Sequence, residues 1–170
     1  YVVSKQGYQT YKTLNKYNPK VEEERTLKLK DIDHPIHFRT NALDINAITQ
    51  NLVREEYGML PVFSTPPQNI IDGGGYIGDL AIYYLNKFPE SRLFVFEPES
   101  NNFPYAEKNL SPYGDRVKLY QAGLWDKETT LSIEGKKTGA HLVENGSSEG
   151  GKVKCIPIGK IVSDFNLETI

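Results

Sequence analysis

The sequence predicts an α/β fold in which helices cover both faces of a parallel sheet, preceded by a small β-hairpin and a helix. Short apolar runs alternate with helical patterns from residue 69 onward. A glycine-rich turn separates the first of these runs from the first helix. A proline-containing stretch at residues 64–67 interrupts both helix and strand and separates this region from the segment before it. Together these patterns favour βαβ units and a parallel sheet.

Length and composition fit one ordinary globular domain. The chain has 170 residues and a formal net charge of −2, so bulk charge indicates neither a nucleic-acid partner nor a membrane surface. Cys155 is the only cysteine, which excludes an internal disulfide and a cysteine metal cluster. No apolar run has the length of a membrane span, and the first residues lack the apolar stretch of a signal peptide. We expect a cytoplasmic protein, and the sequence does not indicate its oligomeric state.

The region before the sheet divides into two parts. Residues 1–26 are polar and tyrosine-rich and are expected to form an N-terminal arm. Residues 27–66 are expected to form a lead-in element, in which apolar residues alternate up to Phe38 around a turn at Asp33-His34-Pro35. Asn41 can cap the helix that follows, whose apolar face runs to about Glu56.

Residues 67–170 are expected to form the main domain. The runs typical of buried strands are residues 69–71, 93–96 and 117–120. The helical patterns between them are residues 77–88 and 102–110. Two further strands are predicted at residues 131–133 and 153–158, joined by a long loop that includes the flexible segment 145–151.

The segment that indicates chemistry is the glycine loop, Asp72-Gly73-Gly74-Gly75-Tyr76-Ile77-Gly78. It lies directly after the first strand and directly before the first helix. A backbone without side chains allows a ligand to approach closely, and the free N–H groups at a helix start favour a carboxylate or a phosphate. The second strand ends at Glu97-Pro98, where a carboxylate can accept hydrogen bonds from a ribose diol. The two features together predict a ribose-containing ligand.

Two ligands fit this pattern. The loop satisfies the G-x-G-x-x-G spacing of dinucleotide sites, which alone is a weak signal. Asp72 would repel a pyrophosphate but would attract the sulfonium and ammonium of S-adenosylmethionine, so charge favours the latter. The structural alternative is that Asp72 only caps the turn and Glu97 is a solvated strand end.

Three segments in this order resemble the FkbM-type methyltransferases: Ile70 through Gly78, Phe96 through Phe103, and Gln121 through Asp126. The stretch from His34 to Arg39, with Asp44 and Glu55-Glu56-Tyr57, resembles the segment that precedes the glycine motif in that family. The resemblance covers about Leu27 to the end and implies a Rossmann-like class I methyltransferase sheet and methylation of a hydroxyl group with S-adenosyl-L-methionine. It implies that Asp72, Gly73, Gly75 and Gly78 line the methionine portion, Glu97 the ribose, and Ala122, Gly123 and Leu124 the adenine. Gly74, Tyr76 and Pro98 complete the expected cofactor-binding set.

The C-terminus departs from that family, whose members continue with a strand that this sequence does not reach. We therefore expect an incomplete sheet, and a catalytic residue that the sequence does not identify. The histidines His34, His37 and His141 are base candidates that are more simply explained as packing or surface residues. No metal site is expected, since Pro35 breaks the geometry of the His34/His37 pair.

Three functions stay open. The first is an O-methyltransferase that acts on a small molecule, a sugar or other glycan, or a lipid. The second is an NAD(P)-dependent oxidoreductase, and the third is a non-catalytic fragment that binds S-adenosylmethionine. None of the three calls for a nucleic acid or a membrane as partner.

Overall fold

The structure is a computed structural model that describes residues 7–14, 16–17, 22–56, 65–134, 141–144, 151–168 and 170. Residues 57–64 of the expected lead-in element and most of the flexible segment 145–151 lie outside these residues. The elements are mixed α and β, as the sequence predicts.

The N-terminal part combines a two-stranded sheet with helices. Helix α1 (Gly7–Leu14) precedes strands β1 (Glu24–Leu27) and β2 (Ile36–Arg39), which pair antiparallel. The predicted hairpin is therefore present, but its first strand begins before residue 27, in the expected arm, and the connection is longer than the expected turn. Helix α2 (Ala42–Ile48) continues into the π-helical segment η1 (Thr49–Val53). The predicted cap is also confirmed, because Asn41 accepts hydrogen bonds from the N–H groups of Leu43 and Asp44.

The central sheet has three parallel strands in the order β3-β4-β5. The strands are β3 (Asn69–Gly73), β4 (Arg92–Phe96) and β5 (Val117–Tyr120). Helix α3 (Asp79–Lys87) connects the first two strands, and helix α4 (Phe103–Leu110) with the 3-10 segment η3 (Ser111–Arg116) connects the second two. Each predicted strand and helix of this region is present, with bounds that differ by at most two residues.

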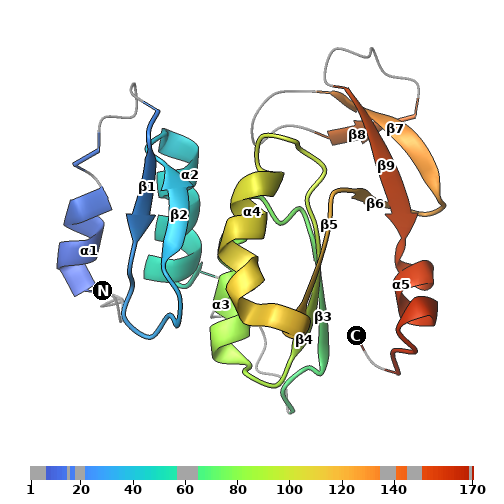
Figure 1. Cartoon of the computed structure of the whole chain (residues 1–170), viewed down its shortest axis with the longest axis horizontal. Helices are drawn as coiled ribbons and strands as arrows, with labels where there is room; N and C mark the ends of the chain where they lie inside the picture. The colour runs from blue at the N-terminus through green and yellow to red at the C-terminus, as the bar shows by residue number, and fades with distance from the viewer. Residues whose placement is uncertain are drawn as a thin grey trace.

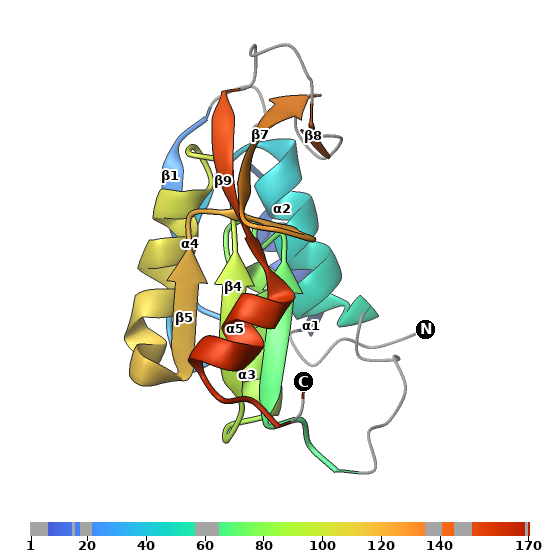
Figure 2. The ribbon, with the colours of Figure 1, turned by 90° about the vertical axis from the view of Figure 1, so that its right-hand side faces the viewer.

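Helices cover both faces of this sheet. Alternate residues of β4 point in opposite directions: Leu93 and Val95 pack with α3 and α4, and Phe94 and Phe96 pack with helix α5 (Ile158–Asp164). Figure 1 shows α3 and α4 on one side of the strands and α5 on the other, and Figure 2 shows α5 in front of β3 and β4.

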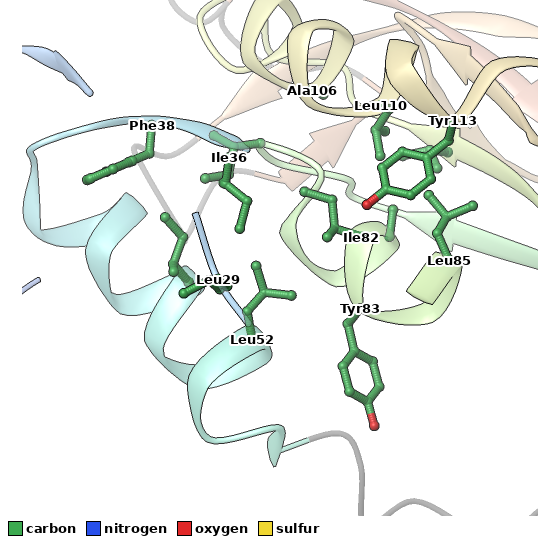
Figure 3. Close-up of a cluster of buried hydrophobic side chains, with 14 of the residues drawn as sticks. Leu29, Ile36, Phe38, Leu52, Ile82, Tyr83, Leu85, Ala106, Leu110 and Tyr113 are labelled. Carbon is green, nitrogen blue, oxygen red and sulfur yellow. The ribbon is translucent and has the colours of Figure 1, made fainter. Parts of the chain in front are cut away.

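The largest apolar core joins the N-terminal part to α3 and α4. Figure 3 shows Ile36 and Leu52 of the N-terminal part beside side chains of the helices that cover the sheet. Leu29 and Phe38 belong to the same core cluster. Because one continuous core includes residues of both regions, the N-terminal part holds a fixed position beside α3 and α4.

A second sheet lies beyond the carboxyl ends of the central strands (Figure 2). Its strands, in the spatial order β6-β9-β7-β8, are β6 (Gly123–Trp125), β9 (Lys152–Pro157), β7 (Thr129–Glu134) and β8 (His141–Val143). The sequence predicts β7 and β9, which pair antiparallel. Cys155 is fully buried in β9 as a small apolar residue. Within the described ranges, no helix is long and apolar enough to cross a membrane.

Candidate functional site

The glycine loop folds back over the end of the neighbouring strand. The N–H groups of Gly74 and Gly75 both donate to the Phe96 carbonyl of β4 at 2.9 Å, and the Gly78 N–H donates to the Gly75 carbonyl at 2.6 Å. These bonds place the loop between the carboxyl ends of β3 and β4. In parallel α/β sheets this edge is where ligands bind.

The glycines of this loop are required for different reasons. A Cβ on Gly75 would lie 2.3 Å from Val95 Cγ1, so this glycine allows the loop to pack on β4. We expected Gly75 to serve ligand approach, and the structure gives it a packing role. Gly74 has a φ of 121° and Gly78 a φ of 84°, backbone conformations that favour glycine. A Cβ on Gly74 would meet no atom within 4 Å, so Gly74 leaves open space above the loop.

Asp72 lies half-buried at the end of β3. Its Oδ2 atom is buried and has no hydrogen-bond partner among the described residues. Burial, with the nearby charges of Asp79 and Glu97, raises the pKa of Asp72 to about 6. The structural alternative of a simple turn cap leaves this oxygen unexplained, because a buried carboxylate oxygen without a donor is costly.

Asp79 is a second buried carboxylate and the first residue of α3. It is 2% exposed, and Asn51 of η1 donates a hydrogen bond to its Oδ2 at 2.5 Å. Burial raises the pKa of Asp79 to about 6, against the lowering effect of Asn51 and of its own backbone N–H. Asp79 and Asn51 were not predicted as site residues from the sequence.

Glu97 is the third carboxylate and is only 4% exposed, so it is not a solvated strand end. Its Oε2 accepts the N–H of Tyr76 at 2.6 Å, and its Oε1 accepts the N–H of Glu99 at 2.8 Å. Burial raises the pKa of Glu97, although these backbone hydrogen bonds oppose the change. Each oxygen keeps a second lone pair, so the carboxylate can hold the loop and still accept from a ligand hydroxyl.

The remaining predicted residues lie around this edge. Ala122 is buried, and Gly123 begins β6, where a Cβ would lie 2.4 Å from Leu142 Cδ1. Leu124 lies against the glycine loop, since a Cβ on Gly73 would meet its Cδ1 at 2.9 Å. Pro98 follows Glu97 and is partly exposed. The structure thus brings the segment around Leu124 next to Gly73, as the predicted site requires.

The site is acidic. Within the described part of the chain, Asp72, Asp79 and Glu97 form no ion pair with a lysine, arginine or histidine. Among the described residues, no group of three or more His, Cys, Asp or Glu side chains could hold a metal ion.

The histidine candidates have other contacts. The His34 ring packs edge-on against Tyr113 with ring centroids 4.9 Å apart, and His37 Nδ1 lies 3.5 Å from Glu24 Oε1. His141 begins β8, opposite Glu134 of β7. None of these contacts involves the glycine loop.

Comparison with known proteins gives sequence relatives. Methyltransferase 1 of Beauveria bassiana is 31% identical over 65 residues, which are 38% of this chain and 26% of that protein. The chain is similar to methyltransferases. The expected resemblance to methyltransferases is therefore confirmed, because one of the relatives is a methyltransferase.

Two further matches cover more of the chain. AMB antimetabolite synthetase AmbE of Pseudomonas aeruginosa is 26% identical over 127 residues, 71% of this chain but only 6% of AmbE. The crystal structure of methyltransferase FkbM from Methylobacillus flagellatus matches with 16% identity and a TM-score of 0.44, and covers 67% of this chain and 27% of that one. The chain thus spans about a quarter or less of the length of these proteins. It matches no protein-family model.

Proposed function

We propose that the chain forms the cofactor-binding part of an S-adenosylmethionine-dependent methyltransferase that methylates a hydroxyl group. The observation that carries the proposal is the partnerless Oδ2 of Asp72, within an acidic loop at the carboxyl ends of β3 and β4. In this proposal the three parallel strands belong to a Rossmann-like class I sheet.

Charge selects between the candidate ligands. A carboxylate that is buried without a donor gains most from a cation, and the ammonium and sulfonium of S-adenosylmethionine supply one each. The negative charges of Asp79 and Glu97 repel that of Asp72 and raise its pKa, so they add to its need for a cation. A dinucleotide pyrophosphate would add negative charge to this loop, so the oxidoreductase alternative is disfavoured.

Four of the predicted residues have separate roles in the proposed site. Asp72 faces the amino-acid part of the cofactor, and Gly74 leaves the open space that the ligand occupies. Glu97 accepts from the ribose with the lone pairs that Tyr76 and Glu99 leave. Leu124, which contacts the Gly73 position, covers one side of the adenine.

The cofactor supplies a methyl group on a sulfonium, and transfer requires an acceptor oxygen in line with it. Holding the two in line supplies most of the acceleration, and a base assists by removing the hydroxyl proton. The part of the chain described above orients the cofactor. The acceptor in this proposal is the hydroxyl of a small molecule, a glycan or a lipid.

The proposal is tested by thermal unfolding of the protein with S-adenosylhomocysteine, NAD⁺ or NADP⁺. A ligand that binds only the native state at a hundred times its Kd stabilises it by about 2.7 kcal/mol. We expect S-adenosylhomocysteine to raise the melting temperature and the nicotinamide cofactors to leave it unchanged. A shift with NAD⁺ alone would favour the oxidoreductase, and binding without turnover of any hydroxyl acceptor would favour a non-catalytic fragment.

A further inference from the structure

Arg39 lies at the end of β2 and is anchored by Asp44 of α2. Its Nε donates to Asp44 Oδ2 and its Nη2 to Asp44 Oδ1, each at 3.0 Å, and its backbone N–H donates to Oδ2 at 2.8 Å. The Arg39 side chain is 11% exposed and that of Asp44 is fully buried. A two-pronged ion pair of this kind fixes the orientation of both side chains.

The same guanidinium reaches the loop that follows β4. Nη2 donates to Asn102 Oδ1 at 2.8 Å, and Nη1 donates to the carbonyl of Asn101 at 3.2 Å. The guanidinium carbon also lies 4.8 Å from the centroid of the Tyr105 ring in α4. Asn102 in turn lies close enough to Glu97 to lower the pKa of that carboxyl. Arg39 thereby connects β2 to the loop beside the carboxylate at the end of β4.

Asp44 reaches the glycine loop by a separate route. The Tyr76 hydroxyl donates to Asp44 Oδ1 at 2.6 Å, while the Tyr76 N–H donates to Glu97 Oε2 at 2.6 Å. Hydrogen bonds thus link Arg39, Asp44, Tyr76 and Glu97 in that order. Asn102, which Arg39 also holds, completes a ring because it acts on the pKa of Glu97.

Tyr76 has a backbone conformation that needs such support. Its φ is 50°, in the left-handed region that bulky residues rarely adopt. Strained residues persist where their surroundings fix them from several sides, and they concentrate at ligand sites. The backbone N–H and the hydroxyl of Tyr76 are held at opposite ends of the residue, by Glu97 and Asp44.

We propose that Arg39 and Asp44 are positioning residues, which set the Glu97 carboxylate for the ribose by fixing Tyr76 and Asn102. The inference rests on the proposed function, since it assigns the ribose to Glu97. It makes the N-terminal hairpin and helix part of the cofactor site, although neither residue touches the cofactor. The alternative is that the ion pair only fastens α2 to the rest of the fold.

The test compares Arg39→Lys and Tyr76→Phe with a matched control, Arg116→Lys. Arg116 donates to the carbonyls of Ser91, Leu85 and Phe88 at the amino ends of the strands, the opposite edge of the sheet. Calorimetry measures the Kd for S-adenosylhomocysteine and for 5′-methylthioadenosine, which keeps the ribose and adenine but lacks the amino acid.

We expect Arg39→Lys and Tyr76→Phe to weaken both ligands by the same factor, about tenfold, because the loss is confined to the ribose. Arg116→Lys should lose stability without a change in either Kd. In a Glu97→Gln background, Tyr76→Phe should weaken binding little further, since the two residues act as a unit. If Arg39→Lys binds both ligands within twofold of the parent, the ion pair is only structural and the inference is wrong.

Amide hydrogen exchange of the ligand-free protein separates this inference from the proposed function. If the parent binds neither ligand, the proposed function fails. Hydrogen exchange still tests whether Arg39 and Asp44 hold Tyr76 and Glu97 in place. Arg39→Lys should speed exchange at the amides of Tyr76 and Glu99, which donate to Glu97, more than at those of Gly74 and Gly75, which donate to Phe96. Equal protection at Tyr76 and Glu99 in parent and variant would overturn the positioning role.

Discussion

Among single residues, Asp72 has an unfavourable environment for a charged carboxylate, because one oxygen is buried without a partner and two other carboxylates lie nearby. Its pKa is raised to about 6, so its proton is held more tightly in the folded than in the unfolded chain. Protonation of Asp72 stabilises the folded chain fully when the pH is below 3.8, the ordinary pKa of an aspartate. This stabilisation is lost as the pH rises through about 6, the pKa in the folded chain. The ligand-free protein therefore carries an uncompensated negative charge at neutral pH.

The first prediction follows from this sign. Asp72→Asn should raise the free energy of unfolding by about 1–2 kcal/mol at pH 7.5 and leave it nearly unchanged at pH 4, where the parent carboxyl is protonated. Urea unfolding of parent and variant at several pH values measures the difference. A gain of equal size at pH 4 and pH 7.5 would mean that packing, not charge, is responsible.

The second prediction concerns Glu97. Glu97→Gln should weaken S-adenosylhomocysteine about tenfold or more, because the amide group presents a donor to Tyr76 or Glu99 and cannot accept as two oxygens do. Glu97→Ala should also lower stability by about 1–3 kcal/mol, since two backbone donors lose their acceptor. Titration calorimetry and thermal unfolding measure the two effects.

Glu99→Ala is the matched control, because the Glu99 side chain accepts from exposed Asn101 and does not bond to the glycine loop. Weaker binding of S-adenosylhomocysteine by Glu99→Ala, with parent-like binding by both Glu97 variants, would assign the ribose to the other carboxylate.

At the scale of elements, the glycine loop and β4 are fitted to each other. A side chain at Gly75 would collide with Val95, so Gly75→Ala should lower the free energy of unfolding by about 1–3 kcal/mol. Val95→Ala removes the Cγ1 atom that the new side chain would strike. The double variant should therefore lose less free energy of unfolding than the two single variants lose together. Strictly additive losses in urea unfolding would contradict this fit.

The strands and helices of the central sheet could be predicted because each has its own local pattern. β4 has a continuous apolar run, and α3 follows the glycine loop directly. Several of the described elements were not predicted. The strands β6 and β8 have three residues each, which is too short for a periodic signal, and α5 follows β9 directly at Pro157 without a side-chain cap.

At the scale of the whole molecule, the site could be predicted only in part. The glycine loop and Glu97 follow from strand ends that are visible in the sequence, and the structure brings them within hydrogen-bond distance. Asp44 and Asn51 could not be assigned to the site, because their partners Tyr76 and Asp79 are 32 and 28 residues away and nothing local marks the contact. Only the packing of the N-terminal part on α3 and α4 creates these pairs.

In the proposed function, the acidic glycine loop binds a cationic, ribose-containing cofactor. Calorimetric titration of the parent protein and of Asp72→Asn with S-adenosylhomocysteine and with NAD⁺ at pH 7.5 tests this most directly. We predict saturable binding of S-adenosylhomocysteine by the parent, binding about tenfold or more weaker by the variant, and no binding of NAD⁺ by the parent. Saturable binding of NAD⁺ by the parent, improved by removing the Asp72 charge, with no response to S-adenosylhomocysteine, would contradict the account.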